Sequence, residues 1–157
     1  MSFKPYTFAA GAISALGLGI HLTVGGKHVV TPLLKKHEEK QLNERVTNLL
    51  YACWHITSLT LAASSAVLVS YALGREHLIG KLIKVTPELV DYVCEVNLGA
   101  ALLALDLSLF GVVDQEKEEN LETKQIVLRR LTRFPQWMAF GLIGLLPFVD
   151  KRFLAKK

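Results

Sequence analysis

The sequence predicts an all-α integral membrane protein, a four-helix up-and-down bundle whose spans are joined by short amphipathic segments. Hydrophobic residues make up 51% of the 157 positions. They gather in long runs, whereas most charged residues lie between and after these runs. An apolar run of about 20 residues can cross the hydrocarbon core as a helix. The chain has room for about four such runs but not for a separate soluble domain. We therefore expect one transmembrane domain, residues 1–157, with spans at about 6–30, 47–73, 88–113 and 134–150.

The first expected span ends by residue 30, because Pro32 disfavours helix at the preceding residue and cannot continue the hydrogen-bond ladder. Gly11, Ala15 and Gly19 recur at every fourth position, a spacing that lets a second helix backbone come close. We expect a neighbouring stripe of small and polar residues to face other helices and not lipid. It comprises Ser14, Gly17, His21, Gly25 and His28.

The second expected span has no charged residue between Asn48 and Ser70, yet it carries a histidine beside a tryptophan. Its polar and small residues fall within about 100° of arc on one face, and Leu, Val, Ile and Ala cover most of the rest. A helix with this division belongs inside a bundle, with lipid on one side only. We expect the following polar face to meet other spans: Asn48, Tyr51, His55, Ser58, Ala62 and Ser65.

The third expected span begins at Thr86, Pro87 and Glu88, which combine a capping hydroxyl, a first-turn proline and an acid at the positive end of the helix dipole. Its acidic residues all fall on one face. Glu95 and Asp106 are expected at membrane depth, where an unpaired charge costs at least roughly 2.5 to 3.5 kcal/mol. They must be protonated, paired or near water. The acidic face comprises Glu88, Asp91, Glu95 and Asp106.

The fourth expected span follows Pro135, and its apolar run from Trp137 to Val149 is shorter than a usual span. It can cross the membrane if neighbouring residues extend the helix or if other protein covers it. A basic amphipathic segment precedes it and can lie along lipid headgroups with its arginines facing phosphate. The expected interface anchors are Trp137, Arg129, Arg130 and Arg133.

Antiparallel threading brings His21, His55 and Asp106 to a comparable depth, and we expect their side chains to converge in the bundle interior. With His28 and Glu95 they form the expected polar intramembrane cluster. One interpretation is that these side chains only make structural hydrogen bonds between helices. In a second, His21 and His55 bind a cofactor such as haem b, or hold a metal with a carboxylate. In a third, the cluster is a quinone or lipid-headgroup pocket, or a proton path through His55 and Asp106.

Several other function classes lack support in the sequence. The net charge of +4 is modest, and the basic residues alternate with glutamates, so no nucleic-acid partner is expected. Cys53 and Cys94 lie within expected spans and form neither a disulfide framework nor a zinc motif. A glycine-framed serine, a P-loop, HExxH and CxxC are all missing. We therefore expect no catalytic activity of its own.

Three short motifs, spread over most of the chain, resemble a pattern in small four-helix integral membrane proteins of uncharacterised function. The resemblance implies a four-span fold and supplies no activity. The motifs are His21 with Gly25, Gly26 and VVTPLL; then Cys53, Trp54, His55, Thr57 and Ser58; and then Pro135, Gln136 and Trp137.

The leading functional expectation is a small accessory or structural subunit of a larger membrane complex, of the energy-converting, respiratory type. Small-residue ridges, a short fourth span and polar faces inside the membrane favour it. Its expected partners are other transmembrane subunits and membrane lipids. Its expected location is the mitochondrial inner membrane, with a bacterial inner membrane as the alternative. The competing hypothesis is an independent membrane protein that binds haem, a metal or a quinone through His21 and His55.

Overall fold

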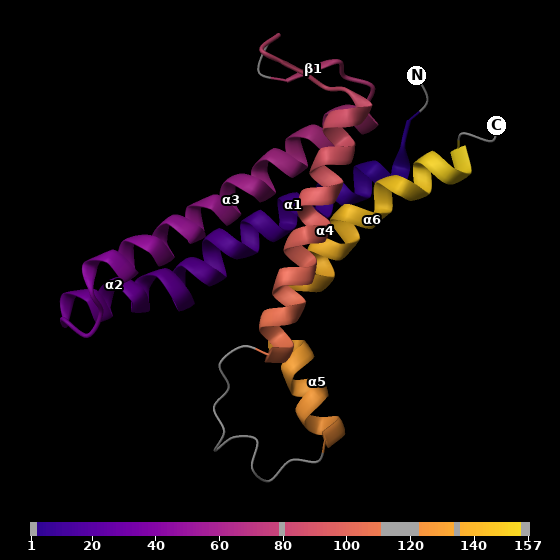
Figure 1. The fold of residues 1–157 in the computed structure, drawn as a ribbon. Coiled ribbons are helices and arrows are strands. Elements are labelled where there is room, and N and C mark those ends of the chain that lie inside the picture. The colour runs from indigo at the N-terminus through magenta and orange to yellow at the C-terminus, as the bar shows by residue number, and fades with distance from the viewer. Residues whose placement is uncertain (1–2, 79–80, 111–122, 134–135, 155–157) are drawn as a thin grey trace.

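The computed structural model describes residues 3–78, 81–110, 123–133 and 136–154. Helices form nearly all of this part of the chain, as predicted (Figure 1). The exception is a short antiparallel hairpin in which His77 pairs with Lys84 and Leu78 with Ile83. In chain order the elements are α1 (Pro5–Ile20), η1 (His21–Val30), α2 (Thr31–Glu38), α3 (Glu44–Ala72), β1 (His77–Leu78), β2 (Ile83–Lys84), α4 (Pro87–Phe110), α5 (Thr123–Arg133) and α6 (Gln136–Leu154).

The first helix runs without a break through Pro32, so the expectation that it ends by residue 30 is wrong. The elements α1, η1 and α2 form one continuous helix, Pro5–Glu38. In its middle part, η1, the backbone adopts the wider π-helical turn, and the N–H of Thr31 bonds to the carbonyl of Gly26. A proline ring crowds the carbonyl four residues before it, and the wider turn leaves more room there. The π segment thus lets the helix accommodate Pro32.

Helices α1 and α3 form a long antiparallel pair (Figure 1). Asn43 starts α3, because its side chain accepts a hydrogen bond of 2.7 Å from the backbone N–H of Arg45. Near the other end of the pair the backbones come close at Gly11, where a Cβ atom would lie 2.7 Å from Cγ2 of Val69. The Ser14 hydroxyl donates to the carbonyl of Leu61 at 2.8 Å. Close approach and an interhelical hydrogen bond are the means expected to join helices within a membrane.

Helix α6 packs against both α4 and α1. The fully buried side chains of Ala10, Leu68, Val90 and Ile143 come from α1, α3, α4 and α6, and they form the core. From the end that carries both termini, the α1–α3 pair and α4 diverge (Figure 1). The helices therefore share one core near this end and do not stay packed along their full length.

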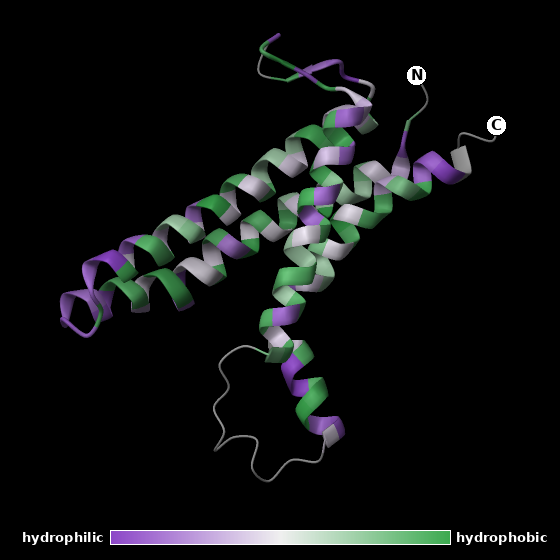
Figure 2. Cartoon of the chain, in the orientation of Figure 1, coloured by the Kyte–Doolittle hydropathy of each residue, from purple (hydrophilic) through white to green (hydrophobic). Residues whose placement is uncertain are grey.

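Three of the described helices are long and apolar enough to cross a membrane: Pro5–Glu38, α3 and α4. The chain therefore has the helices of an integral membrane protein. Helix α6 is not among these three, since its last turns contain Asp150, Lys151 and Arg152. In Figure 2 hydrophobic residues dominate α1, α3 and α4, and hydrophilic residues gather at the α2–α3 turn and in α5. A complete four-span bundle is not confirmed.

Candidate functional site

His21 and Trp54 form the closest ring contact between the first two long helices. His21 opens the π segment η1, and its imidazole lies almost flat on the indole of Trp54, with ring centroids 3.6 Å apart and planes 16° apart. Its Nε2 atom also lies 3.3 Å from the backbone carbonyl oxygen of Trp54. The stack lies at the start of the ten-residue π segment, and π-helical turns are frequent at functional sites. This pair is therefore the first candidate site.

Gly25 makes room for the indole ring. A Cβ atom at this position would lie only 2.2 Å from Cη2 of Trp54, whereas a Cβ at the neighbouring Gly26 would meet nothing within 4 Å. The tryptophan therefore fills space that only glycine leaves open. The indole lies between His21 and Gly25, which are about one turn apart on η1, so this segment and α3 fit together closely.

The hydrogen bond of His21 defines its neutral form. A carbonyl oxygen only accepts, so Nε2 of His21 must carry the proton that it donates to Trp54. The other ring nitrogen, Nδ1, is then unprotonated in the neutral imidazole.

His55 does not face His21 as a second axial ligand of haem would. It follows Trp54 directly, and consecutive helical residues are about 100° apart around the axis. Because Trp54 points toward His21, His55 points elsewhere; its side chain is exposed and meets Tyr51 of its own helix edge-on, with centroids 4.4 Å apart. These two histidines do not fit a bis-histidine haem site. Within the described residues, no group of three or more His, Cys, Asp or Glu side chains is placed to hold a metal ion.

The expected polar cluster does not converge. His28, His55, Glu95 and Asp106 are exposed, and they lie on three different elements. In the part of the chain that the structure describes, no hydrogen bond, ion pair or ring contact joins any of them to another or to His21. The physical reason is the divergence of α4 from the α1–α3 pair (Figure 1).

The face of α3 that meets α1 also differs from the expected one. Asn48 and Tyr51 are exposed, whereas Leu61 and Leu68 are buried in the core. Of the polar face predicted for this span, the first half (Asn48, Tyr51 and His55) is exposed, whereas Ser58, Ala62 and Ser65 are half-buried. Burial of large apolar side chains, and not pairing of polar ones, decides which side of α3 faces its neighbours.

The small and polar stripe of the first span does face another helix, as predicted. Ser14 bonds to α3, and a Cβ atom on Gly17 would make ordinary contact, at 3.7 Å, with Leu61. His21 and Gly25 hold Trp54, and only the exposed His28 departs from the expectation. Of the other predicted ridge, Gly11 makes a close contact but Gly19 meets nothing.

Asp150 is a buried acidic residue whose role the sequence did not reveal. Its side chain is 5% exposed and accepts hydrogen bonds from the backbone N–H and the hydroxyl of Thr7, at 2.6 and 2.7 Å. The backbone N–H of Tyr6 also points to it, at 3.4 Å. Helix α1 has no side-chain cap of its own and no acid in its first turn. That missing cap was the one available signal that a distant acid would serve it.

Three further polar contacts join separate parts of the chain. Lys151, the residue after Asp150, forms an ion pair with Asp91 of α4. The Lys4 ammonium lies 3.2 Å from the ring centroid of Tyr71 in α3. Asn97 of α4 is fully buried and donates to the Ser64 hydroxyl of α3 at 2.9 Å. Polar side chains outside the expected cluster thus link several pairs of helices.

The expected interface anchors lie around the α5–α6 junction. The indole N–H of Trp137 donates to the carbonyl of Leu131 at 3.0 Å, and Arg130 donates to the carbonyl of Leu109 at 2.9 Å. Arg129 is exposed on α5. Arg133 ends that helix, and its side chain lies outside the described part. An interface role for these residues remains a prediction.

Comparison with known proteins found no relative of this chain. No protein-family model matches the chain, and neither a curated protein sequence nor a solved structure matches it.

Proposed function

We propose that this chain is an accessory or structural subunit of a larger membrane complex. The acidic face of α4 carries the proposal. Glu95 and Asp106 are exposed on this helix, which is apolar and long enough to span a membrane. Leu102 lies between them and is 69% exposed. No other described helix of this chain covers Glu95 or Asp106.

A carboxyl group inside a membrane does not face lipid without cost. Glu95 lies about 12 Å along α4 from Pro87, which places it well inside a span that begins there. Ionisable residues at such depth almost always face protein or water, because lipid penalises their charge. Asp91, nearer the start of α4, is paired with Lys151 within this chain. Among the described residues Glu95 and Asp106 have no such partner, so a neighbouring subunit is expected to supply one.

The same assembly accounts for the short last helix. The apolar part of α6 is short, and the helix contains Pro147 and ends in charged residues. Neighbouring subunits that cover this helix would let it act as a fourth crossing. We further propose that the complex is an energy-converting one, in the mitochondrial or a bacterial inner membrane. Small multi-span chains with little mass outside the membrane suit an accessory role in such a complex.

Native extraction of the tagged full chain in a mild detergent tests this proposal. The parent chain is expected to migrate with a complex much larger than its own 17.4 kDa. The double variant Glu95→Gln with Asp106→Asn is expected to be released from that complex. Glu88→Gln, at the exposed start of the same helix, is the matched control and should stay bound. A parent chain that migrates as a monomer, with no other protein, would contradict the proposal.

A further inference from the structure

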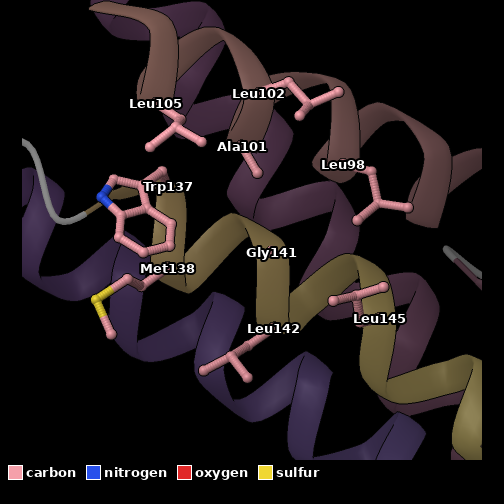
Figure 3. A pocket seen from close by; sticks show the side chains of 9 residues that line it. All are labelled: Leu98, Ala101, Leu102, Leu105, Trp137, Met138, Gly141, Leu142 and Leu145. Atoms are coloured by element: carbon pink, nitrogen blue, oxygen red, sulfur yellow. The ribbon is translucent and has the colours of Figure 1, made fainter. Parts of the chain in front are cut away.

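Two pockets in the described part of the chain differ in charge. The larger lies between α4 and α6, encloses about 520 Å³ and is lined by apolar side chains, with Leu105 and Trp137 at one end (Figure 3). None of its lining residues is charged, so nothing in it selects one membrane component over another. The smaller pocket encloses about 370 Å³, and its lining includes Lys4, Arg75 and Glu76. We call it the terminal pocket, because it lies at the end of the molecule that carries both termini (Figure 1).

The walls of the terminal pocket are held by backbone contacts between separate segments. The N–H of Lys4 donates to the carbonyl of Ala72 at 3.3 Å, which places the start of α1 beside the end of α3. The chain leaves α3 at Gly74, whose φ of 70° lies in the left-handed region that favours glycine. The carbonyl of Glu76 then accepts a hydrogen bond of 2.8 Å from the N–H of Val85, just before α4. The pocket is therefore a fixed part of the fold.

Lys4 and Arg75 bring hydrogen-bond donors to this pocket. The Lys4 ammonium lies 3.2 Å from the ring centroid of Tyr71, which also lines the pocket. An ammonium has three N–H donors and a guanidinium five. Among the described residues, no carboxylate or carbonyl accepts a hydrogen bond from the side chain of Lys4 or Arg75. Glu76 is the one acid in the lining, so two positive residues and one negative residue leave a net charge of +1. An anion is the ligand that this charge and these donors favour.

This end of the molecule lies where lipid headgroups are expected. The three candidate spans, Pro5–Glu38, α3 and α4, each begin or end beside the terminal pocket. Three of the four tyrosines of the chain, Tyr6, Tyr71 and Tyr92, lie within two turns of these helix ends. Tyr6 is 44% exposed and Tyr92 is 64% exposed. Tyrosine is enriched at the boundary between membrane and water, so an anion at this level is typically a phospholipid phosphate.

We propose that the terminal pocket binds the phosphate of an anionic phospholipid and that Lys4 and Arg75 hold it. The unused donors favour an anion, and the position at the ends of three candidate spans favours a lipid as its source. Arginine matches phosphate geometry with paired hydrogen bonds, and lysine supplies a compact positive charge. The proposal does not depend on the subunit role proposed above.

Native mass spectrometry of the detergent-solubilised full chain tests the site. Phosphatidylglycerol and phosphatidylcholine with identical acyl chains are titrated separately, and the apparent Kd of the first bound lipid is measured. Phosphatidylglycerol should bind more tightly to the parent chain. Lys4→Gln and Arg75→Gln should each weaken its binding about fivefold, which is the contribution of one basic residue close to an anionic lipid.

Two further variants distinguish the pocket from general surface charge. Lys81→Gln removes one positive charge from the exposed turn of the hairpin, outside the pocket lining, and should leave the Kd of phosphatidylglycerol unchanged. Glu76→Gln removes the negative charge of the pocket and should tighten the binding of phosphatidylglycerol about fivefold. Unfolding of a variant cannot produce this gain.

Equal binding of the two lipids by the parent chain would overturn the proposal. An equal loss of binding in Lys4→Gln and Lys81→Gln would also overturn it, because the preference would then come from surface charge in general. Inorganic phosphate, titrated in the same way, should bind far more weakly than phosphatidylglycerol, since it lacks acyl chains that contact the apolar helices. Binding of inorganic phosphate as tight as that of the lipid would indicate a site for a free anion and overturn the assignment to a lipid.

Discussion

The side chain of Asp150 in α6 accepts two hydrogen bonds from Thr7 in α1, one from the backbone N–H of Thr7 and one from its hydroxyl. The contact joins the last helix to the first turn of the first helix and is almost completely buried. A carboxyl group at a helix N-terminus satisfies free N–H groups and interacts favourably with the helix dipole. The first helix of this protein is thus capped by a residue from the other end of the chain.

The first prediction concerns this cap. Asp150→Ala should lower the free energy of unfolding by about 3 kcal/mol, because it leaves buried donors of Thr7 without an acceptor. Asp150→Asn keeps one acceptor oxygen and should lose about half as much. Unfolding of the detergent-solubilised protein, followed by far-ultraviolet circular dichroism, measures both. Thr7→Val with Asp150→Ala should cost much less than the sum of the single changes, and simple additivity would contradict the direct contact.

The three long apolar helices could be predicted from the sequence, because the hydrophobic runs are long and only a helix satisfies its own backbone in lipid. The end of the first helix could not. The proline rule placed it before Pro32, and the wider π turn in η1 overrides that rule. The capping role of Asp150 could not be predicted either, because it depends on how α6 crosses α1, and no local sequence pattern specifies that crossing.

The candidate site was only partly predictable. The helical stripe that contains His21 and Gly25 was correctly expected to face another helix, since small residues favour close packing. Its partner was not predicted, because polarity favoured His55 over the adjacent Trp54 as the inward-facing residue. In the structure the large ring takes the space beside Gly25, and His55 stays exposed. The size of the Trp54 ring, and not the polarity of His55, determined which residue of α3 contacts Gly25.

The second prediction concerns the space at Gly25. Gly25→Ala should lower the free energy of unfolding by about 1 to 2 kcal/mol, because the new methyl group overlaps the Trp54 ring. Gly26→Ala is the matched control: its methyl group meets nothing, and the gain in helix propensity should raise stability by up to about 1 kcal/mol. In a Trp137→Phe background, Trp54 emission should shift only for Gly25→Ala. Equal effects of the two variants would rule out the close fit.

The third prediction concerns Asn97, whose Nδ2 atom donates to Ser64 and to the carbonyl of Val93. Its Oδ1 atom is buried and has no partner among the described residues. Asn97→Leu should therefore change stability by less than about 1 kcal/mol, since the lost hydrogen bond is worth about 0.6 kcal/mol in a membrane and an unsatisfied oxygen is removed with it. Thermal unfolding in detergent measures the change. A loss above about 2 kcal/mol would reveal a further partner of Oδ1.

The fourth prediction uses the two cysteines to report on the contact of α4 with α6. Cys53 is exposed and Cys94 is buried, so N-ethylmaleimide should label one thiol per folded chain, at Cys53. In a Cys53→Ser background labelling should be almost absent.

In this background Gly144→Ala should expose Cys94. The new methyl group at position 144 would lie 2.9 Å from the carbonyl oxygen of Cys94, and a backbone atom cannot move aside as a flexible side chain can. Gly141→Ala, with its nearest contact at 4.0 Å, should leave Cys94 protected. Mass spectrometry of the intact chain counts the labels, and rapid labelling of Cys94 in the Cys53→Ser protein itself would contradict the helix packing described above.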